Sequence, residues 1–216
     1  MPQYSMVIFI FLNITAMMFY AGGNINNPDY DGYSFIRNFF SDLGRRYSLS
    51  GESNLISCVL FNSSLTIVGL TFITLFYKAR TIFTEYSILV FLATIFGVYS
   101  GFSYVGVAFT PADLYLKEHI FFAHWAFRAL FASSILYSIL IFKTDGFDNK
   151  YAYAFIIFGF MVLFYVLYSE VVLDDPRTNP ASLIKHVVAQ KMVVFWILLA
   201  VYIYSIGVGK FLSRKV

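Results

Sequence analysis

A histidine and an arginine inside an apolar segment are the residues most suited to chemistry in this chain. Arg128 lies near the middle of residues 119–142, which are long and apolar enough to cross a bilayer, and His124 precedes it by four residues. Side chains four apart share one face of a helix. A charge at that depth costs about 3 to more than 10 kcal/mol, so it needs a partner or a wet cavity. The pair therefore predicts a polar interior.

A second group of candidates for catalysis follows an apolar stretch nearer the N-terminus. Ser41 and Asp42 form a hydrolytic set if a histidine such as His124 lies beside them, with Arg128 as a further candidate. The Gly-x-Ser-x-Gly elbow of many hydrolases is missing from the sequence, however. An Asp before Gly most often caps a turn, and we take turn capping as the ordinary role of Asp42.

Metal binding is the next chemistry to weigh, because the chain has three histidines. His119 and His124 are five residues apart, whereas a helical zinc pair uses a spacing of three or four. Zinc remains an alternative if His186 joins them with a carboxylate from Asp42, Glu170 or Asp174. We expect no metal site. The interpretation we prefer is a hydrogen-bonded polar network that satisfies the buried charge.

That network is expected to centre on Arg128. Asp42 is the first choice as its carboxylate partner, and Glu170 is the second. We expect His124, Arg128, Asp42 and Gln190 to hydrogen-bond one another. The remaining candidates for the network are Asn54, His119, Glu170, Asp174, His186, Gln190 and Lys191.

The elements that position these residues follow from composition. Hydrophobic residues make up 59% of the 216 residues and charged residues 12%, and the mean hydropathy is +0.72. Such a chain is an integral membrane protein, and we expect the cell membrane. A helical crossing needs about 20 apolar residues, and we expect an all-α bundle of six transmembrane helices. They cover about residues 4–20, 55–77, 86–107, 119–142, 151–168 and 187–208, within one domain spanning 1–216.

Basic residues predict the orientation of the bundle. With both termini cytoplasmic, three short inner segments carry Lys78, Arg80, Lys143, Lys150, Lys210, Arg214 and Lys215. The outer side carries eight basic residues, but spread over much longer loops. Density in short loops decides topology, so we expect both termini inside. All three histidines then lie on the outer side together with Arg128.

The largest outer segment is the loop of residues 22–54. Within it, Tyr33 to Phe40 is expected to form a short interfacial helix. Asn54 is expected to cap the second transmembrane helix. In the third, Gly97 and Gly101 form a stripe of small residues that allows another helix to approach closely.

Several short motifs resemble a known family. They are Phe40-Ser41-Asp42-Leu43-Gly44-Arg45, Asn54, the run from Val105 to Pro111, His119 and His124 with Ala126 and Phe131, and Gln190-Lys191 before Trp196. Together they resemble the membrane-protein family named domain of unknown function 998, and Ser-Asp-Leu-Gly is distantly similar to a stretch of the Frag1/DRAM/Sfk1 group. The resemblance implies a six-helix membrane domain and a functional role for Ser41, Asp42, one histidine of residues 119–142 and Gln190-Lys191. It implies no particular reaction. The family favours arginine where this chain has Lys191, so a bidentate contact there is not expected.

Three classes of function are compatible with these residues. The first is a non-catalytic accessory subunit or lipid-associated scaffold whose polar network is structural. The second is a membrane-embedded hydrolase or lipid-modifying enzyme with an outward-opening site, and the third is a small transporter or receptor-like binder. We expect membrane lipids and other membrane subunits as partners. No basic run is long enough to suggest nucleic acid.

Overall fold

The computed structural model describes residues 2–214 and every side chain among them except that of Glu170. It is all-helical, which confirms the all-α part of the expected fold class. The α-helices are α1 (Pro2–Met18), α2 (Leu55–Ala79), α3 (Ser87–Phe109), α4 (Leu116–Lys143), α5 (Lys150–Leu167) and α6 (Pro180–Ser213). A 3-10 helix, η1 (Phe40–Gly44), precedes α2, and a π-helical turn, η2 (Tyr168–Val172), follows α5. No strand occurs in residues 2–214.

Five of the helices, α2 to α6, are long and apolar enough to cross a membrane. Helix α1 is apolar but has only 17 residues, and at 1.5 Å per residue it is about 25 Å long. That is less than a hydrocarbon core of about 30 Å. Helix α1 is one residue shorter than α5, and both lie near the lower limit of length for a membrane crossing.

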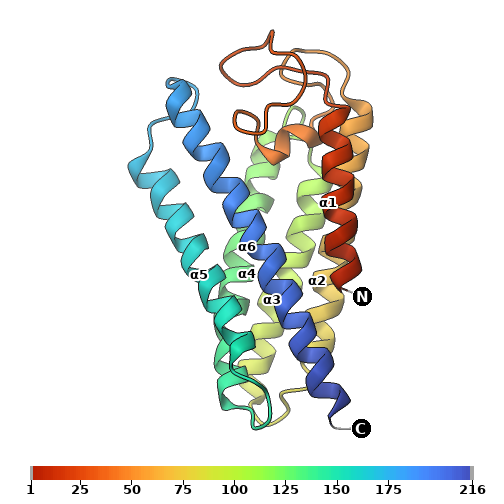
Figure 1. Cartoon of the computed structure of the whole chain (residues 1–216), viewed down its shortest axis with the longest axis vertical. Coiled ribbons are helices and arrows are strands. Elements are labelled where there is room, and N and C mark those ends of the chain that lie inside the picture. The colour runs from red at the N-terminus through yellow and green to blue at the C-terminus, as the bar shows by residue number, and fades with distance from the viewer. Residues whose placement is uncertain (1, 215–216) are drawn as a thin grey trace.

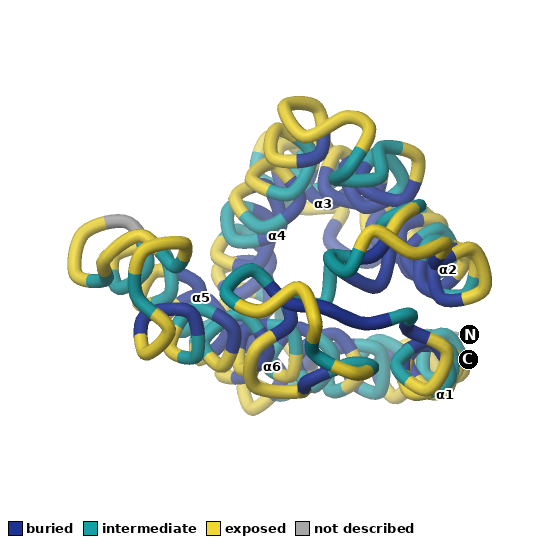
Figure 2. The backbone as a smooth tube through the Cα atoms, turned by 90° about the horizontal axis from the view of Figure 1, so that it is seen from above, coloured by how far each residue is buried: buried dark blue, intermediate teal, exposed yellow. Residues whose placement is uncertain are grey.

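The helices run up and down a single bundle. Each helix packs on the next one in the chain, and α6 also contacts α1, which closes the arrangement (Figure 2). Residues 19–54, 110–115 and 173–179 lie at one end, which we call the upper end (Figure 1). Residues 80–86, 144–149 and the C-terminus lie at the lower end. The candidate residues from the long loop, from the start of α4 and from the start of α6 are thereby collected at the upper end.

Helix α6 extends beyond the expected range of 187–208. It begins at Pro180, where the Asn179 side chain accepts hydrogen bonds from the backbone N–H groups of Ala181 and Ser182. An N-cap followed by proline starts a helix whatever the polarity of the next turn. A hydropathy window detects only the apolar part, and for this reason it missed the first turns.

Helices α2 and α3 approach closely, as the stripe of small residues predicts. A Cβ atom added to Gly101 would lie 2.6 Å from the backbone oxygen of Gly69, so only glycine fits at this contact. The prediction of close packing at the stripe is confirmed.

Aromatic rings fill the lower half of the bundle. The ring centroids of Phe76 and Tyr137 are 5.4 Å apart, those of Tyr137 and Tyr204 5.6 Å, and those of Phe155 and Tyr204 4.7 Å. All four side chains are fully buried, and they come from α2, α4, α5 and α6. This cluster fills the core of the lower part of the bundle.

The expected helix from Tyr33 to Phe40 is wrong. Residues 33–39 form turns, and helical structure begins only at Phe40 as η1. The buried Asn38 explains the difference, because its side chain accepts a hydrogen bond from Ser34 N and donates one to Gly23 O. Such bonds between an asparagine side chain and the backbone compete with a helix.

Candidate functional site

The short helix η1 lies across the upper end of the bundle and is held there by polar side chains. Phe40 N donates to the Gln190 side chain at 2.9 Å, and Phe39 N donates to the Asp42 carboxylate at 2.8 Å. A helix of five residues cannot satisfy its own terminal N–H and C=O groups, so buried backbone atoms here need side-chain partners. Asp42 therefore caps the turn, as expected.

Asn54 has a different role from the expected one. It stands at the start of α2, but its side chain makes no capping hydrogen bond. Its Nδ2 instead donates to the carbonyl oxygens of Leu43 at 3.1 Å and Arg45 at 3.0 Å. Ser57 Oγ adds a third hydrogen bond, also to Leu43 O. The beginning of α2 therefore anchors the end of η1, because the carbonyls of Leu43 and Arg45 have no partner within the short helix.

Lys191 supports the other side of η1 from α6. Its ammonium donates to Asn38 O at 2.6 Å, and the side chain is only 7% exposed. The rings of Tyr33, Phe35 and Phe40 lie 5.5, 4.9 and 5.0 Å from Nζ. Lys191 thus makes one strong hydrogen bond and several cation–π contacts. A single carbonyl acceptor suits an ammonium, whereas a guanidinium presents a planar fork of donors suited to a bidentate contact.

Asp42 is the buried carboxylate of this site. Burial raises the pKa of Asp42 to about 6 from its usual 3.8. The charges of Arg45 and Lys191 and the hydrogen bonds from Asn38 and Phe39 act in the opposite direction and favour the ionised form. The expected pairing of Asp42 with Arg128 is therefore replaced by other partners, because η1 turns the carboxylate toward its own N–H groups.

Below the long loop, a wide cavity lined by both polar and apolar side chains opens at the upper end of α4. Its volume is about 980 Å³, and we call it the vestibule. Residues from the long loop, η1, α4, α5 and α6 line it. Its polar lining comprises Ser41, Asp42, Arg45, Asp113, His119, His124, Arg128, Ser169, Arg177 and His186. Tertiary structure thus collects Ser41, Asp42, the three histidines and Arg128 around one space.

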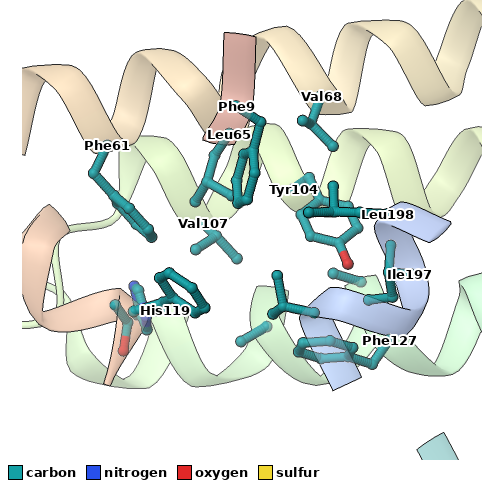
Figure 3. A pocket seen from close by; sticks show the side chains of 15 residues that line it. Phe9, Phe61, Leu65, Val68, Tyr104, Val107, His119, Phe127, Ile197 and Leu198 are labelled. Carbon is teal, nitrogen blue, oxygen red and sulfur yellow. The ribbon is translucent and has the colours of Figure 1, made fainter. Parts of the chain in front are cut away.

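A second, smaller cavity lies inside the bundle, and we call it the chamber. Its volume is about 80 Å³, and its lining is almost wholly apolar (Figure 3). Side chains from α1, η1, α2, α3, α4 and α6 line it. Ser41, His119, Ala123 and Phe127 line both the chamber and the vestibule. The two cavities therefore adjoin, with a polar side and an apolar side.

His119 lies at this junction in a defined hydrogen-bonding state. Its Nδ1 is 2.7 Å from the carbonyl oxygen of Thr110. A carbonyl can only accept, so Nδ1 carries the hydrogen and Nε2 of the neutral ring is left with its lone pair. His119 is therefore able to accept a hydrogen bond or a proton through Nε2.

The remaining candidates occupy separate positions. His124 and Arg128 are both exposed on the vestibule face of α4. His186 contacts the backbone oxygen of Asp174 through Nε2 at 3.1 Å, and the exposed Asp174 carboxylate accepts from Asn179. The side chain of Glu170 lies outside the described residues. In place of direct bonds among His124, Arg128, Asp42 and Gln190, the bonds of Asp42 and Gln190 go to the segment containing η1.

Among the side chains that the structure describes, no three His, Cys, Asp or Glu residues are placed to hold a metal ion. Two residues important to the site were not identified from the sequence. Asn38 links Gly23, Ser34, Asp42 and Lys191, and its spacing of four from Asp42 was the available signal. Tyr104 lines the chamber, and it is one of 17 tyrosines with nothing in its local sequence to set it apart.

Comparison with known proteins adds no further constraint. No protein-family model, curated protein or solved structure matches the chain. The resemblance to domain of unknown function 998 stays a prediction, and function is argued from the site alone.

Proposed function

We propose that this chain is a non-catalytic membrane protein that binds an amphipathic, lipid-like ligand at its upper end. The polar end of the ligand occupies the vestibule, and an apolar chain extends from it into the chamber. The observation that carries the proposal is the junction of the two cavities at Ser41, His119, Ala123 and Phe127.

The dimensions and lining of the cavities support this assignment. The vestibule, at about 980 Å³, is at the upper end of the usual range for ligand sites. The chamber, at about 80 Å³, exceeds the volume of about 10–15 Å³ that one water needs. An ordered water also needs two to four polar partners, which an apolar lining does not supply. A narrow apolar chain suits such a space better than water.

The experiment uses radiolabelled stearic acid and delipidated protein in detergent. Ala123 lines both cavities, so Ala123→Trp is expected to obstruct the junction and to weaken binding at least tenfold. The matched control is Ile135→Trp, which places the same ring at an exposed position of the same helix. The control should bind like the original protein. Equal binding by both variants, or no binding to the original protein, would refute the proposal.

We further propose that six helices cross the cell membrane with both termini cytoplasmic and the vestibule facing outward. The density of Lys and Arg in the short lower segments supports this orientation. A cysteine at Asp148 should react with an impermeant reagent only after the membrane is opened, whereas one at Asp29 should react in intact cells. The buried Cys58 is replaced by serine in both variants. Reversed labelling would overturn the orientation.

A hydrolase that acts on such a ligand is the second candidate. It is supported by Ser41 and His119 at the junction, with Nε2 of His119 able to accept the hydroxyl proton. If the original protein hydrolyses an ester here, the Ser41→Ala variant should still bind the ester but release no product. Incubation of labelled esters with both proteins, followed by extraction and mass spectrometry, tests this. Equal hydrolysis in both would exclude Ser41 as the nucleophile.

A further inference from the structure

The chamber contains one polar atom without a partner. The hydroxyl of Tyr104 is buried, and no hydrogen bond to it is formed within residues 2–214. Figure 3 shows this hydroxyl among Ile197, Leu198 and Phe127. A buried hydroxyl is normally bonded, so an orphan calls for an explanation.

Tyr104 and His119 lie at opposite ends of the chamber (Figure 3). The ring of Tyr104 lies edge-on to Phe127, with centroids 6.3 Å apart. Phe127 is eight residues beyond His119 on α4, which corresponds to about 12 Å along the helix. Of the described side chains that line the chamber, only Ser41, His119 and Tyr104 carry polar atoms. The hydroxyl is therefore isolated from the other polar atoms of the chamber.

Isolation of this kind disfavours water as the partner. A buried water makes about three hydrogen bonds, whereas the lining offers only one polar group at this depth. A ligand oxygen needs only the single bond that Tyr104 provides. The geometry thus suits a polar atom carried inward on an apolar chain.

We infer that the ligand bears a hydroxyl or carbonyl oxygen partway along its chain and that Tyr104 recognises it. The ligand class is an oxygenated long-chain amphiphile. The inference rests on the proposed function and deepens it, since it assigns a specificity-determining residue to the same site.

A set of octadecanoic acids that differ in the position of one hydroxyl tests the inference by competition against radiolabelled stearic acid. One member of the set should bind about tenfold more tightly than stearic acid, the effect of one added hydrogen bond. Tyr104→Phe should bind stearic acid at least as well as the original protein but lose the preference. Its thermal stability without ligand should be equal or higher, because it lacks the unpartnered hydroxyl.

Tyr204→Phe is the matched control. It removes another buried hydroxyl without a described partner, in the aromatic cluster rather than at the chamber. This variant should keep the preference. If stearic acid binds but no hydroxylated acid is preferred, or if Tyr104→Phe keeps the preference, the inference alone is overturned. If stearic acid does not bind, the proposed function fails with it.

Discussion

Replacing Lys191 by methionine removes the ammonium that supports η1 while keeping a similar length of side chain. The change deletes the hydrogen bond to Asn38 O and the contacts with three aromatic rings. A charged hydrogen bond contributes about 1.5–3 kcal/mol, and a cation–π contact about 0.5–2 kcal/mol. Relief from burying the charge offsets part of this. We expect a net loss of about 2–3 kcal/mol in the free energy of unfolding, combining these magnitudes.

For a chain of this size, such a loss lowers the melting temperature by about 4–12 °C, at 2–4 °C per kcal/mol. The only cysteine provides the assay, because Cys58 is buried and its Sγ contacts Gly44 O of η1 at 3.2 Å. A fluorogenic maleimide reports when this thiol becomes accessible on heating. Lys185→Met is the control, since Lys185 is exposed on the same helix.

A double-mutant cycle with Asp42→Asn isolates the electrostatic part of the stability lost in Lys191→Met. Asparagine can still accept from Phe39 N, so Asp42→Asn mainly removes the negative charge that faces Lys191. Lys191→Met should therefore cost about 1–2 kcal/mol less in the Asp42→Asn background, as expected for directly interacting groups. Strictly additive effects, or a Lys191→Met protein as stable as the Lys185→Met control, would refute the reasoning.

Three further predictions use the same thermal assay. Because the pKa of Asp42 is raised to about 6 from 3.8, the folded state retains a proton that the unfolded state releases first. The free energy of unfolding should fall by about 3 kcal/mol between pH 4 and pH 6 and level off above pH 6. The same dependence on pH in Asp42→Asn would contradict this. Gly101→Ala places a Cβ against α2 and should cost about 1–3 kcal/mol. Gly209 has open space around it, so the control Gly209→Ala should not destabilise the protein. Equal melting temperatures of the two variants would count against the close contact. Asn54→Ala leaves the Arg45 carbonyl without a side-chain donor and removes one of the two donors to Leu43 O. It should cost about 1–3 kcal/mol and speed up labelling of the thiol at constant temperature. Asn149→Ala, an exposed helix start without a side-chain cap, is the control, and labelling no faster than in the control would argue against the anchoring role of Asn54.

The helical architecture could be predicted from the sequence. Apolar windows are a one-dimensional signal, and they located all six helices because each window is bounded by polar turns. The stripe at Gly97 and Gly101 also predicted the close contact of α3 with another helix, since small residues at helical spacing favour such packing in a membrane. The ends of the helices were predicted less accurately. The start of α6 depends on the cap at Asn179, which a hydropathy window does not register.

The hydrogen-bond partners of the polar residues depend on tertiary packing and could not be predicted from the sequence. The sequence identified Asp42, Asn54, Gln190 and Lys191 as candidates, but it predicted bonds of Asp42 and Gln190 to His124 and Arg128 and a capping role for Asn54. In the folded chain most of these bonds go to the backbone around η1, whose unsatisfied groups exist only because residues 33–39 do not form a helix. Tyr104 is the extreme case, since neighbours from α4 and α6 isolate its hydroxyl. Such roles depend on long-range packing, so they cannot be predicted from the local sequence.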